Sequence, residues 1–396
     1  MGDGVRYIGT AERRARLGLR HRLTGATRAA DPAGVADSLV ALHGTDPATV
    51  YLAVGARLTD PAKTVAETER ALYEERTLVR MHGMRHTVFV FPTELTAVVH
   101  ASTGLAVAAR ERASLIKSMA KAGAPDAAWL ADVEESTLAA LARRGQATAA
   151  ELAQDEPRLR ERFAYAAGKS YEGVHTVSTR LLRVLGVEGK VVRGRPLGSW
   201  TSSQFRWAVA PEHPELDAAA AQAELLRRGL AVCGPATEAD LKWWTGWKVT
   251  EVRRALTAIG AEAVSVDEGT GYVVQGDAGP VDAPAEPWAA LLPGLDPTAM
   301  GWQQRDWYLA PELRPSLFDG SGNVGPTVWW NGRVVGGWAQ RADGEIVWRL
   351  LAGLGSEERQ AAETAVAAQA ERLRGWVGAA RVTPRFRTPV EKELSA

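Results

Sequence analysis

The sequence predicts an α+β fold in which three helical units, each followed by strands, precede a β-rich C-terminal unit. Helix-capping residues recur through residues 10–259, and segments rich in β-branched and aromatic residues follow the helices. Residues 327–351 alternate between apolar and polar positions around an Asn-Gly turn. The three helix-then-strand units recur at intervals of roughly 80–110 residues, which indicates a repeated module.

The composition is that of a globular protein. The chain has 396 residues, 46% of them hydrophobic, with 47 basic and 47 acidic side chains. This length suffices for about two to four packed units. Its single cysteine, Cys233, excludes a disulfide scaffold and a cysteine-based zinc module. No apolar run reaches the ~18 residues of a membrane span, and residues 1–5 show no secretory signal, so we expect a cytoplasmic protein with no membrane partner.

The first unit begins with helices and ends with strands. We expect a helix over residues 11–23 and a second over residues 32–42, with Asp31 as its N-cap and Pro32 in its first turn. Asp46 and Pro47 repeat that arrangement before a helix over residues 47–58. Residues 77–91 are rich in β-branched and aromatic side chains and favour extended structure.

The second and third units follow the same plan. In the second unit we expect a helix over residues 127–143, a short helix that begins at the capping box Thr148–Glu151, and a third helix over residues 173–185. A basic β-hairpin at residues 189–207 then makes the plan that of a winged helix, with residues 173–185 as recognition helix. The third unit has a capping box at Thr237–Asp240, helices over residues 241–247 and 248–259, and a strand over residues 272–275.

The composition shifts after Gly276 to Asp, Pro and Gly, which is typical of a linker. Beyond it, the Asn331-Gly332 hairpin predicts a small barrel, which a helix over residues 356–376 closes. The predicted organisation is three winged-helix modules and a β-barrel-like module, with these boundaries: 1–125, 126–215, 216–276 and 277–396.

The charge is unevenly distributed along this neutral chain. Residues 157–210 hold ten basic and three acidic side chains, whereas residues 255–304 hold seven acidic ones and neither Lys nor Arg. A basic island of this kind is either a phosphate-binding surface or a solvated face. The side chains expected to bind DNA in this part of the chain are Lys169, Arg180, Lys190, Arg193 and Arg195.

Several classes of site are excluded. The sequence lacks a phosphate-binding P-loop, a His-Glu-x-x-His metal motif and a Gly-x-Ser-x-Gly nucleophile elbow. The closest histidine pair, His82 and His86, lies in predicted strand, which favours a solvent-facing or cleft-lining pair over a metal site. We therefore expect neither a metal nor a cofactor.

The segment from His43 to Pro47 has two interpretations. It is either a turn between helices, with Gly44 relaxing the backbone and Asp46 capping the next helix, or a catalytic loop. In the second case the imidazole of His43, the hydroxyl of Thr45 and the carboxylate of Asp46 would hold a water molecule and take its proton.

The segment from Val35 to Leu58, which contains this turn, resembles the N-terminal signature of the winged-helix DNA glycosylases. This AlkZ-type family comprises bacterial enzymes of crosslink unhooking and antibiotic self-resistance. Other segments resemble its Arg-Gly-Thr strand, its second wing, its third winged helix and the entry to its C-terminal β-module: residues 78–87, 189–207, 236–244 and 291–297. Well-known members carry Gln-x-Gln or Gln-x-Asp where this chain has His43-Gly44-Thr45, and His86 stands where glycine is usual.

The resemblance implies a monofunctional DNA glycosylase that removes bulky or cationic alkylated purines, N7-guanine adducts above all, in base excision repair or self-resistance. His43, Thr45 and Asp46 would be catalytic, Arg80, His82, Arg85 and His86 would join the basic island in binding double-stranded DNA, and no protein partner is required. The departure at His43-Gly44-Thr45 leaves three possibilities: a working variant, a changed substrate or lost catalysis. The alternative function is a non-catalytic winged-helix DNA-binding protein, either a regulator or an adduct-sequestering factor.

Overall fold

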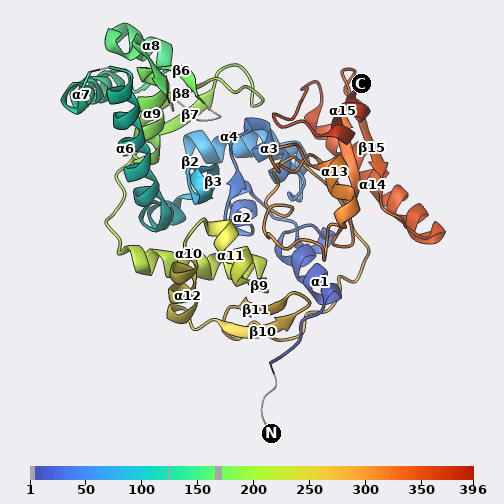
Figure 1. The fold of residues 1–396 in the computed structure, drawn as a ribbon. Coiled ribbons are helices and arrows are strands. Elements are labelled where there is room, and N and C mark those ends of the chain that lie inside the picture. Colours follow the sequence, from blue (N-terminus) through green and yellow to red (C-terminus); the bar gives the residue numbers. More distant parts are fainter. Residues whose placement is uncertain (1–4, 124, 166–171) are drawn as a thin grey trace.

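The computed structural model describes residues 5–123, 125–165 and 172–396, and Lys169 therefore lies outside the described residues. The predicted boundaries serve below as names for four units, which Figure 1 shows in blue to teal, green, yellow and orange to red. In the first unit the helices and strands are α1 (Thr10–Arg20), α2 (Pro32–Asp37), β1 (Leu42–His43), α3 (Pro47–Gly55), α4 (Thr64–Glu69), β2 (Leu78–His82), β3 (Val88–Pro92), α5 (Thr96–Val99) and α6 (Leu105–Lys121).

The other units contain further helices and strands. Those of the second unit are α7 (Ala127–Arg144), β4 (Gln146–Ala147), α8 (Ala149–Asp155), β5 (Arg162–Tyr165), β6 (Gly173–Thr176), α9 (Val177–Val187), β7 (Val191–Pro196) and β8 (Phe205–Val209). Those of the third are α10 (Ala218–Cys233), β9 (Ala236–Thr237), α11 (Glu238–Thr245), α12 (Val249–Ala258), β10 (Glu262–Val266) and β11 (Gly269–Val273). Those of the C-terminal unit are β12 (Ala289–Leu292), α13 (Arg314–Leu317), β13 (Thr327–Trp330), β14 (Arg333–Gln340), β15 (Ile346–Leu350), α14 (Ser356–Val377) and α15 (Pro389–Ser395).

One strand topology occurs in each of the first three units. A two-residue strand (β1, β4 or β9) lies between two helices and pairs antiparallel with the second strand of a later hairpin. The resulting sheets have the orders β1-β3-β2, β4-β8-β7 and β10-β11-β9. At the end of each short strand or just after it, a side chain caps the next helix: Asp46 for α3, Thr148 for α8 and Thr237 for α11. The three caps are as predicted, but α3 ends at Gly55 rather than at residue 58, and α11 covers Glu238–Thr245 rather than residues 241–247.

Local departures from the prediction have backbone causes. The helix expected over residues 32–42 ends at Asp37, because Val40 takes a left-handed conformation (φ 64°) and the chain then enters β1. The expected recognition helix over 173–185 begins as strand β6, which pairs with β5, and becomes helix α9 only after the Thr176 cap. The predicted extended segment over 77–91 is interrupted by a 3₁₀ turn at Met84–His86.

The C-terminal unit forms an open sheet of order β12-β13-β14-β15, so the prediction of a small barrel is wrong: within the described residues, edge strands β12 and β15 do not pair. Helices cover both faces of this sheet. Ala289 and Leu291 pack in one cluster with α14, while Ala290 and Leu292 pack in another cluster with α15. The helices therefore bury the surface that closure would otherwise bury.

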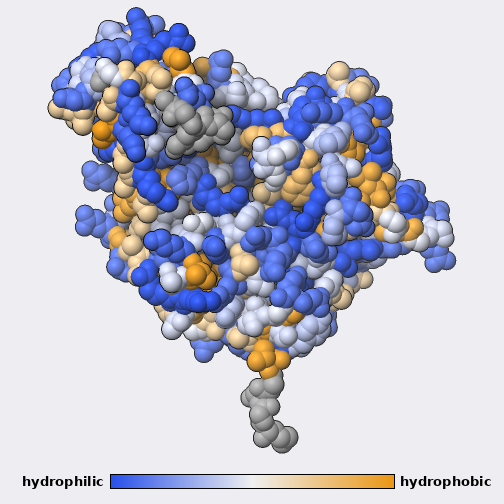
Figure 2. All heavy atoms as spheres, viewed as in Figure 1, coloured by the Kyte–Doolittle hydropathy of each residue, from blue (hydrophilic) through white to orange (hydrophobic). Residues whose placement is uncertain are grey.

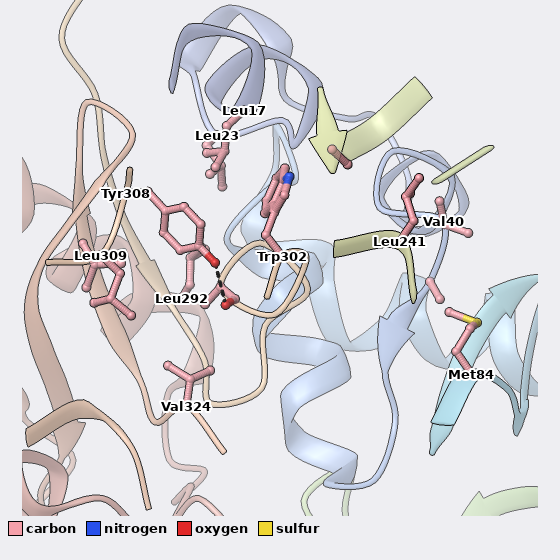
Figure 3. Close-up of a cluster of buried hydrophobic side chains, with 14 of the residues drawn as sticks. Leu17, Leu23, Val40, Met84, Leu241, Leu292, Trp302, Tyr308, Leu309 and Val324 are labelled. Carbon is pink, nitrogen blue, oxygen red and sulfur yellow. Dashed lines mark hydrogen bonds between the residues drawn. The ribbon is translucent and has the colours of Figure 1, made fainter. Parts of the chain in front are cut away.

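The main core crosses unit boundaries. Leu17 of α1, Met84, Leu241 of α11 and Leu292 of β12 belong to one cluster, part of which Figure 3 shows around Trp302 and Tyr308. The second unit differs, because its buried residues from Leu130 to Trp207 form a separate cluster, which also takes in Leu115 and Met119 of α6. In Figure 1 the helices of this unit and the C-terminal unit lie on opposite sides of the first unit, and Figure 2 shows an indentation between these two lobes. The two units still touch through the β7–β8 loop, where the ring centroid of Trp200 lies 5.9 Å from that of Trp376 of α14. Within the described residues, no helix is both long and apolar enough to cross a membrane.

Candidate active site and basic cleft

A pocket of about 90 Å³ lies where the first, third and C-terminal units meet. The first unit contributes His43 of β1 together with Met84, Arg85, Thr87 and Phe89 from the β2–β3 connection. The other walls come from distant parts of the chain: Trp244 of α11, and Leu295, Pro297, Met300 and Asn323 of the C-terminal unit. The pocket therefore depends on the shared core that holds these units together.

Among the side chains in the pocket wall, His43 is the one best suited to take part in a reaction. It pairs with Phe89 across β1 and β3, and its imidazole meets the Phe89 ring edge-on, with 5.3 Å between ring centroids. Its Nδ1 is buried and has no hydrogen-bond partner within the described residues. Burial, reinforced by the nearby positive charge of Arg85, lowers the pKa of His43 to about 4. The imidazole is therefore neutral at pH 7 and offers a lone pair to a substrate or a water molecule.

Asp46 does not face this pocket. Its Oδ1 accepts a hydrogen bond from the main-chain N–H of Ala48 at 3.2 Å, and its Oδ2 accepts one from that of Arg385 at 3.0 Å. The side chain is 8% exposed and lines a separate small cavity with Thr49 and Pro384. The geometry thus assigns Asp46 to capping and to holding the C-terminal segment, which is the first of the two sequence interpretations.

Thr45 is half-buried and outside the lining of the His43 pocket. The structure describes no hydrogen bond from its hydroxyl. The predicted trio of imidazole, hydroxyl and carboxylate around one water molecule is therefore not assembled: the pocket receives His43 alone of the three.

Arg85 places a cation beside His43. Its guanidinium lies 4.2 Å from the centroid of the Trp243 ring, and the guanidinium of Arg305 lies 5.1 Å from the same ring. Burial and the charge of Arg305 lower the pKa of Arg85. Neither arginine has an acidic partner in the described part of the chain, so both charges remain available to a phosphate.

Left-handed backbone conformations concentrate around the pocket. Arg85 (φ 55°) and Leu295 (φ 62°) line it, His86 (φ 59°) follows Arg85, and Val40 precedes the lining residue Ala41. Each such conformation in a non-glycine residue costs about 1–3 kcal/mol, and strain of this kind concentrates at functional sites. The φ of His86 also explains why a glycine suits this position in similar sequences.

The basic island is largely neutralised by acids from outside residues 157–210. Arg195 pairs with Glu69 at 2.9 Å and with Glu74 at 3.0 Å. Arg180 stacks 3.5 Å from the Tyr165 ring centroid and lies 3.5 Å from Glu111, while Lys190 pairs with Glu134 and Glu188. Arg193 differs, because its guanidinium stacks 4.4 Å from the Phe205 ring and no acidic partner is described for it.

The two predicted histidines of the β2–β3 segment have different surroundings. His82 is buried, 6% exposed, and burial together with nearby Arg193 lowers its pKa to about 3. His86 is more exposed, and its Nδ1 lies 3.5 Å from Glu111. The described residues contain no group of three or more His, Cys, Asp or Glu side chains that could hold a metal ion. Cys233 is half-buried, and desolvation raises the pKa of its thiol to about 12, which makes the thiol a poor nucleophile.

Four residues around the pocket were not predicted from the sequence: Trp243, Trp244, Arg305 and Asn323. All four come from units other than that of His43, and no local motif marks them as a site. The one available signal is the tryptophan pair Trp243-Trp244 directly after the Thr237 capping box, because two adjacent large aromatic residues on a short helix cannot both face its core.

Two comparisons with known proteins gave a match. The family described as DNA glycosylase AlkZ-like matches residues 36–376. Among solved structures, the DNA glycosylase AlkZ of Streptomyces sahachiroi is similar to this chain, with 19% sequence identity and a TM-score of 0.69, over 96% of this chain and 100% of AlkZ. At that identity the likeness concerns the fold. No curated protein gives a significant match.

Proposed function

The chain belongs to the AlkZ-like DNA glycosylase family, and we propose that it hydrolyses the N-glycosidic bond of bulky or cationic alkylated purines in double-stranded DNA. N7-alkylguanine is the preferred substrate of this proposal, in base excision repair or in self-resistance to a genotoxic natural product. The observation that carries the proposal is the neutral, unpaired imidazole of His43 in a pocket between three units.

The reaction does not require the protein to protonate the leaving base. A purine alkylated at N7 is already positively charged, so when the bond from C1′ to the base breaks, the electron pair neutralises the ring. A water molecule then adds to C1′, and its proton is released. A lone pair on His43 accepts a hydrogen bond from that water and holds it at C1′.

The low pKa of His43 indicates whether the imidazole orients the water molecule or deprotonates it. An imidazole with a pKa of about 4 is a weak base, so its main contribution is to orient the water rather than to deprotonate it fully. Asp46 supports the turn through its cap, and Thr45 contributes a hydrogen bond that forms on substrate binding. Among the described residues no lysine lines the pocket, so a Schiff-base lyase step is not part of the proposal.

DNA binding is proposed to use the three repeated units as winged helices, with the boundaries 1–125, 126–215 and 216–276. The shared strand topology of these units supports this division. Arg80, Arg85 and Arg193 are the predicted DNA-binding arginines without an acidic partner in the described chain, and Arg305 joins them from the C-terminal unit. Arg180, Lys190 and Arg195 would contact phosphate only as members of ion pairs. A reaction on the bacterial chromosome places the protein in the cytoplasm, at the nucleoid.

The test is a base-excision assay. The full-length protein is incubated with duplex DNA that carries N7-methylguanine or a bulky N7 adduct, and the DNA is then heated in alkali, which cleaves abasic sites. The expected result is strand breaks at the lesion well above those of the same modified duplex heated in alkali without protein, and none in unmodified duplex. Binding to the modified duplex without breaks would refute the proposed substrate class and favour adduct sequestration.

A further inference from the structure

A second pocket, of about 220 Å³, lies between β2 of the first unit and β7 of the second. Its lining combines buried and exposed residues. Leu72, Leu78 and Arg80 are buried and form its inner wall, whereas Arg76 and Arg195 are exposed and form its rim. None of the residues around His43 lines it.

Arg80 is unusual because it is a buried cation for which the described residues provide no counterion. Its side chain belongs to a residue that is 4% exposed, and its Nε and Nη2 have no hydrogen-bond partner within the described residues. The hydroxyl of Tyr73, which also lines the pocket, is buried next to that of Tyr51, and neither hydroxyl has a well-aligned hydrogen bond within the described residues. A buried N–H or O–H group without an acceptor destabilises the folded protein. The pocket therefore presents hydrogen-bond donors that a bound anion would satisfy.

Arg193 brings a second positive charge to the same pocket. Burial and the charges of Arg80, Arg183 and Arg385 lower its pKa to about 10, which shows that like charges are held close together. Arg195 at the rim is different, because Glu69 and Glu74 already neutralise it. Two guanidinium groups therefore face the pocket, and no acidic side chain of the described residues forms an ion pair with either.

We propose that this pocket binds a phosphate group through Arg80, Arg193 and Tyr73. A phosphate accepts several N–H bonds from planar guanidinium groups, and the apolar neighbours Leu72 and Leu78 strengthen such bonds by excluding water. Because the pocket joins the first and second units, a phosphate in it would bridge the body that carries His43 and the wing.

The phosphate can come from the DNA backbone or from a free phosphorylated molecule. The first source deepens the proposed function, since a backbone phosphate here would fix the register of the duplex relative to His43; that source alone rests on the proposed DNA binding. The recognition chemistry is the same in both cases, and the experiment separates them.

The primary test is calorimetric titration of inorganic phosphate into the full-length protein without DNA, at constant ionic strength. Saturable binding is expected for the unmodified protein, at least tenfold weaker binding for Arg80→Met, and several-fold weaker binding for Tyr73→Phe, which removes only the hydroxyl. Arg143→Met is the matched control, because Arg143 is an exposed residue of α7 and its loss changes the net charge equally. It should bind phosphate like the unmodified protein.

Thermal unfolding separates an anion site from a structural arginine. Without phosphate, Arg80→Met should unfold at the same or a higher temperature, because it removes an uncompensated buried charge. With phosphate, the unmodified protein should gain stability and Arg80→Met should not. No saturable phosphate binding, or equal binding by Arg80→Met and the unmodified protein, would overturn the proposal.

A third measurement repeats the phosphate titration with the protein saturated by undamaged duplex DNA. Loss of phosphate binding identifies the occupant as a backbone phosphate, and retained binding identifies a free phosphorylated ligand. Neither readout requires base excision, so a glycosylase assay that fails would leave the phosphate site intact, and the reverse also holds.

Discussion

The main-chain N–H of Arg385 donates a hydrogen bond to Oδ2 of Asp46 across 3.0 Å, and this bond joins the C-terminal segment to the start of α3. The other carboxylate oxygen of Asp46 caps the same helix through Ala48. Asp46 therefore holds the turn that carries His43 against the C-terminal unit, although its own side chain faces away from the His43 pocket. A carboxylate that sequence alone makes a catalytic candidate has a positioning role in this geometry.

Replacing Asp46 should separate stability from chemistry. Asp46→Ala removes the cap and leaves the N–H of Arg385 without its acceptor, so we expect a loss of about 1–3 kcal/mol in the free energy of unfolding. Asp46→Asn keeps the cap acceptor and should lose less. Both variants should excise alkylated bases at close to the normal rate well below their unfolding temperature. Urea denaturation and the excision assay measure the two effects, and a stable but inactive Asp46→Asn protein would make the carboxylate catalytic.

Buried histidines should make the fold sensitive to mild acid. Burial lowers the pKa of His21 to about 3, of His43 to about 4 and of His82 to about 3. Because the unfolded chain takes up these protons near pH 6.5 and the folded chain does not, their stabilising contribution is complete above pH 6.5 and falls as the pH approaches 4. Glu111 and Glu156, whose pKa values are lowered to about 2, lose their contribution only below their unfolded values near 4.5.

The window between pH 6.5 and 4.5 therefore isolates the histidines. Each of them should contribute a slope of about 1.4 kcal/mol per pH unit to the free energy of unfolding. His82→Asn should reduce the measured slope by roughly that amount, whereas Arg143→Gln should leave it unchanged. Denaturant titrations at several pH values give the slope, and an identical slope for His82→Asn would show that His82 is not held neutral.

Local signals predicted the parts of the fold that depend on a few neighbouring residues. Asp31, Asp46, Thr148 and Thr237 cap the helices predicted for them, because a cap bond spans only two or three residues. The shared core was not predictable in this way. Whether the strands around Asn331 close into a barrel depends on which helices cover them, and that is decided by packing across the whole chain.

The same distinction applies to the site. His43 was identifiable because its turn is local and resembles a family signature, whereas Trp244 and Asn323 reach the pocket only through tertiary packing. The positive charge predicted for residues 157–210 is larger than the charge left unpaired in the structure. Acidic partners of these residues, such as Glu69 and Glu111, lie outside that range of the sequence.

Arg193 and Arg195, two residues apart on β7, should differ in DNA binding. Arg193→Ala removes a cation that has no acidic partner in the described structure, so it should weaken binding to all duplex sequences and lower the logarithmic salt slope by about 0.9. Arg195→Ala removes a cation that Glu69 and Glu74 already neutralise, and its effect should be small. Fluorescence anisotropy with labelled duplexes at several salt concentrations compares them. Equal losses for both variants would mean that DNA displaces the two glutamates.

Substitution of His43 tests the proposed chemistry directly. His43→Ala should lower the excision rate at least about tenfold, because the water at C1′ loses its acceptor. Duplex affinity should change little, since the ring is only one of many residues in the pocket wall. His43→Gln should retain most of the rate if the role is orientation, because an amide oxygen also accepts a hydrogen bond but cannot act as a base. Single-turnover excision with an N7-alkylguanine duplex measures each rate.

The pH profile of these variants completes the prediction for His43. The neutral imidazole is the active form, so the excision rate should stay level from pH 8 to about pH 5 and fall only as the pH approaches the pKa of about 4. The His43→Gln variant has no titrating group at this position and should show no such fall while it remains folded, which circular dichroism at each pH establishes. If the rate already declines near pH 6.5, or if His43→Ala has the same rate as the unmodified protein, His43 does not take part in the reaction. The groups around Arg85 would then be the next candidates.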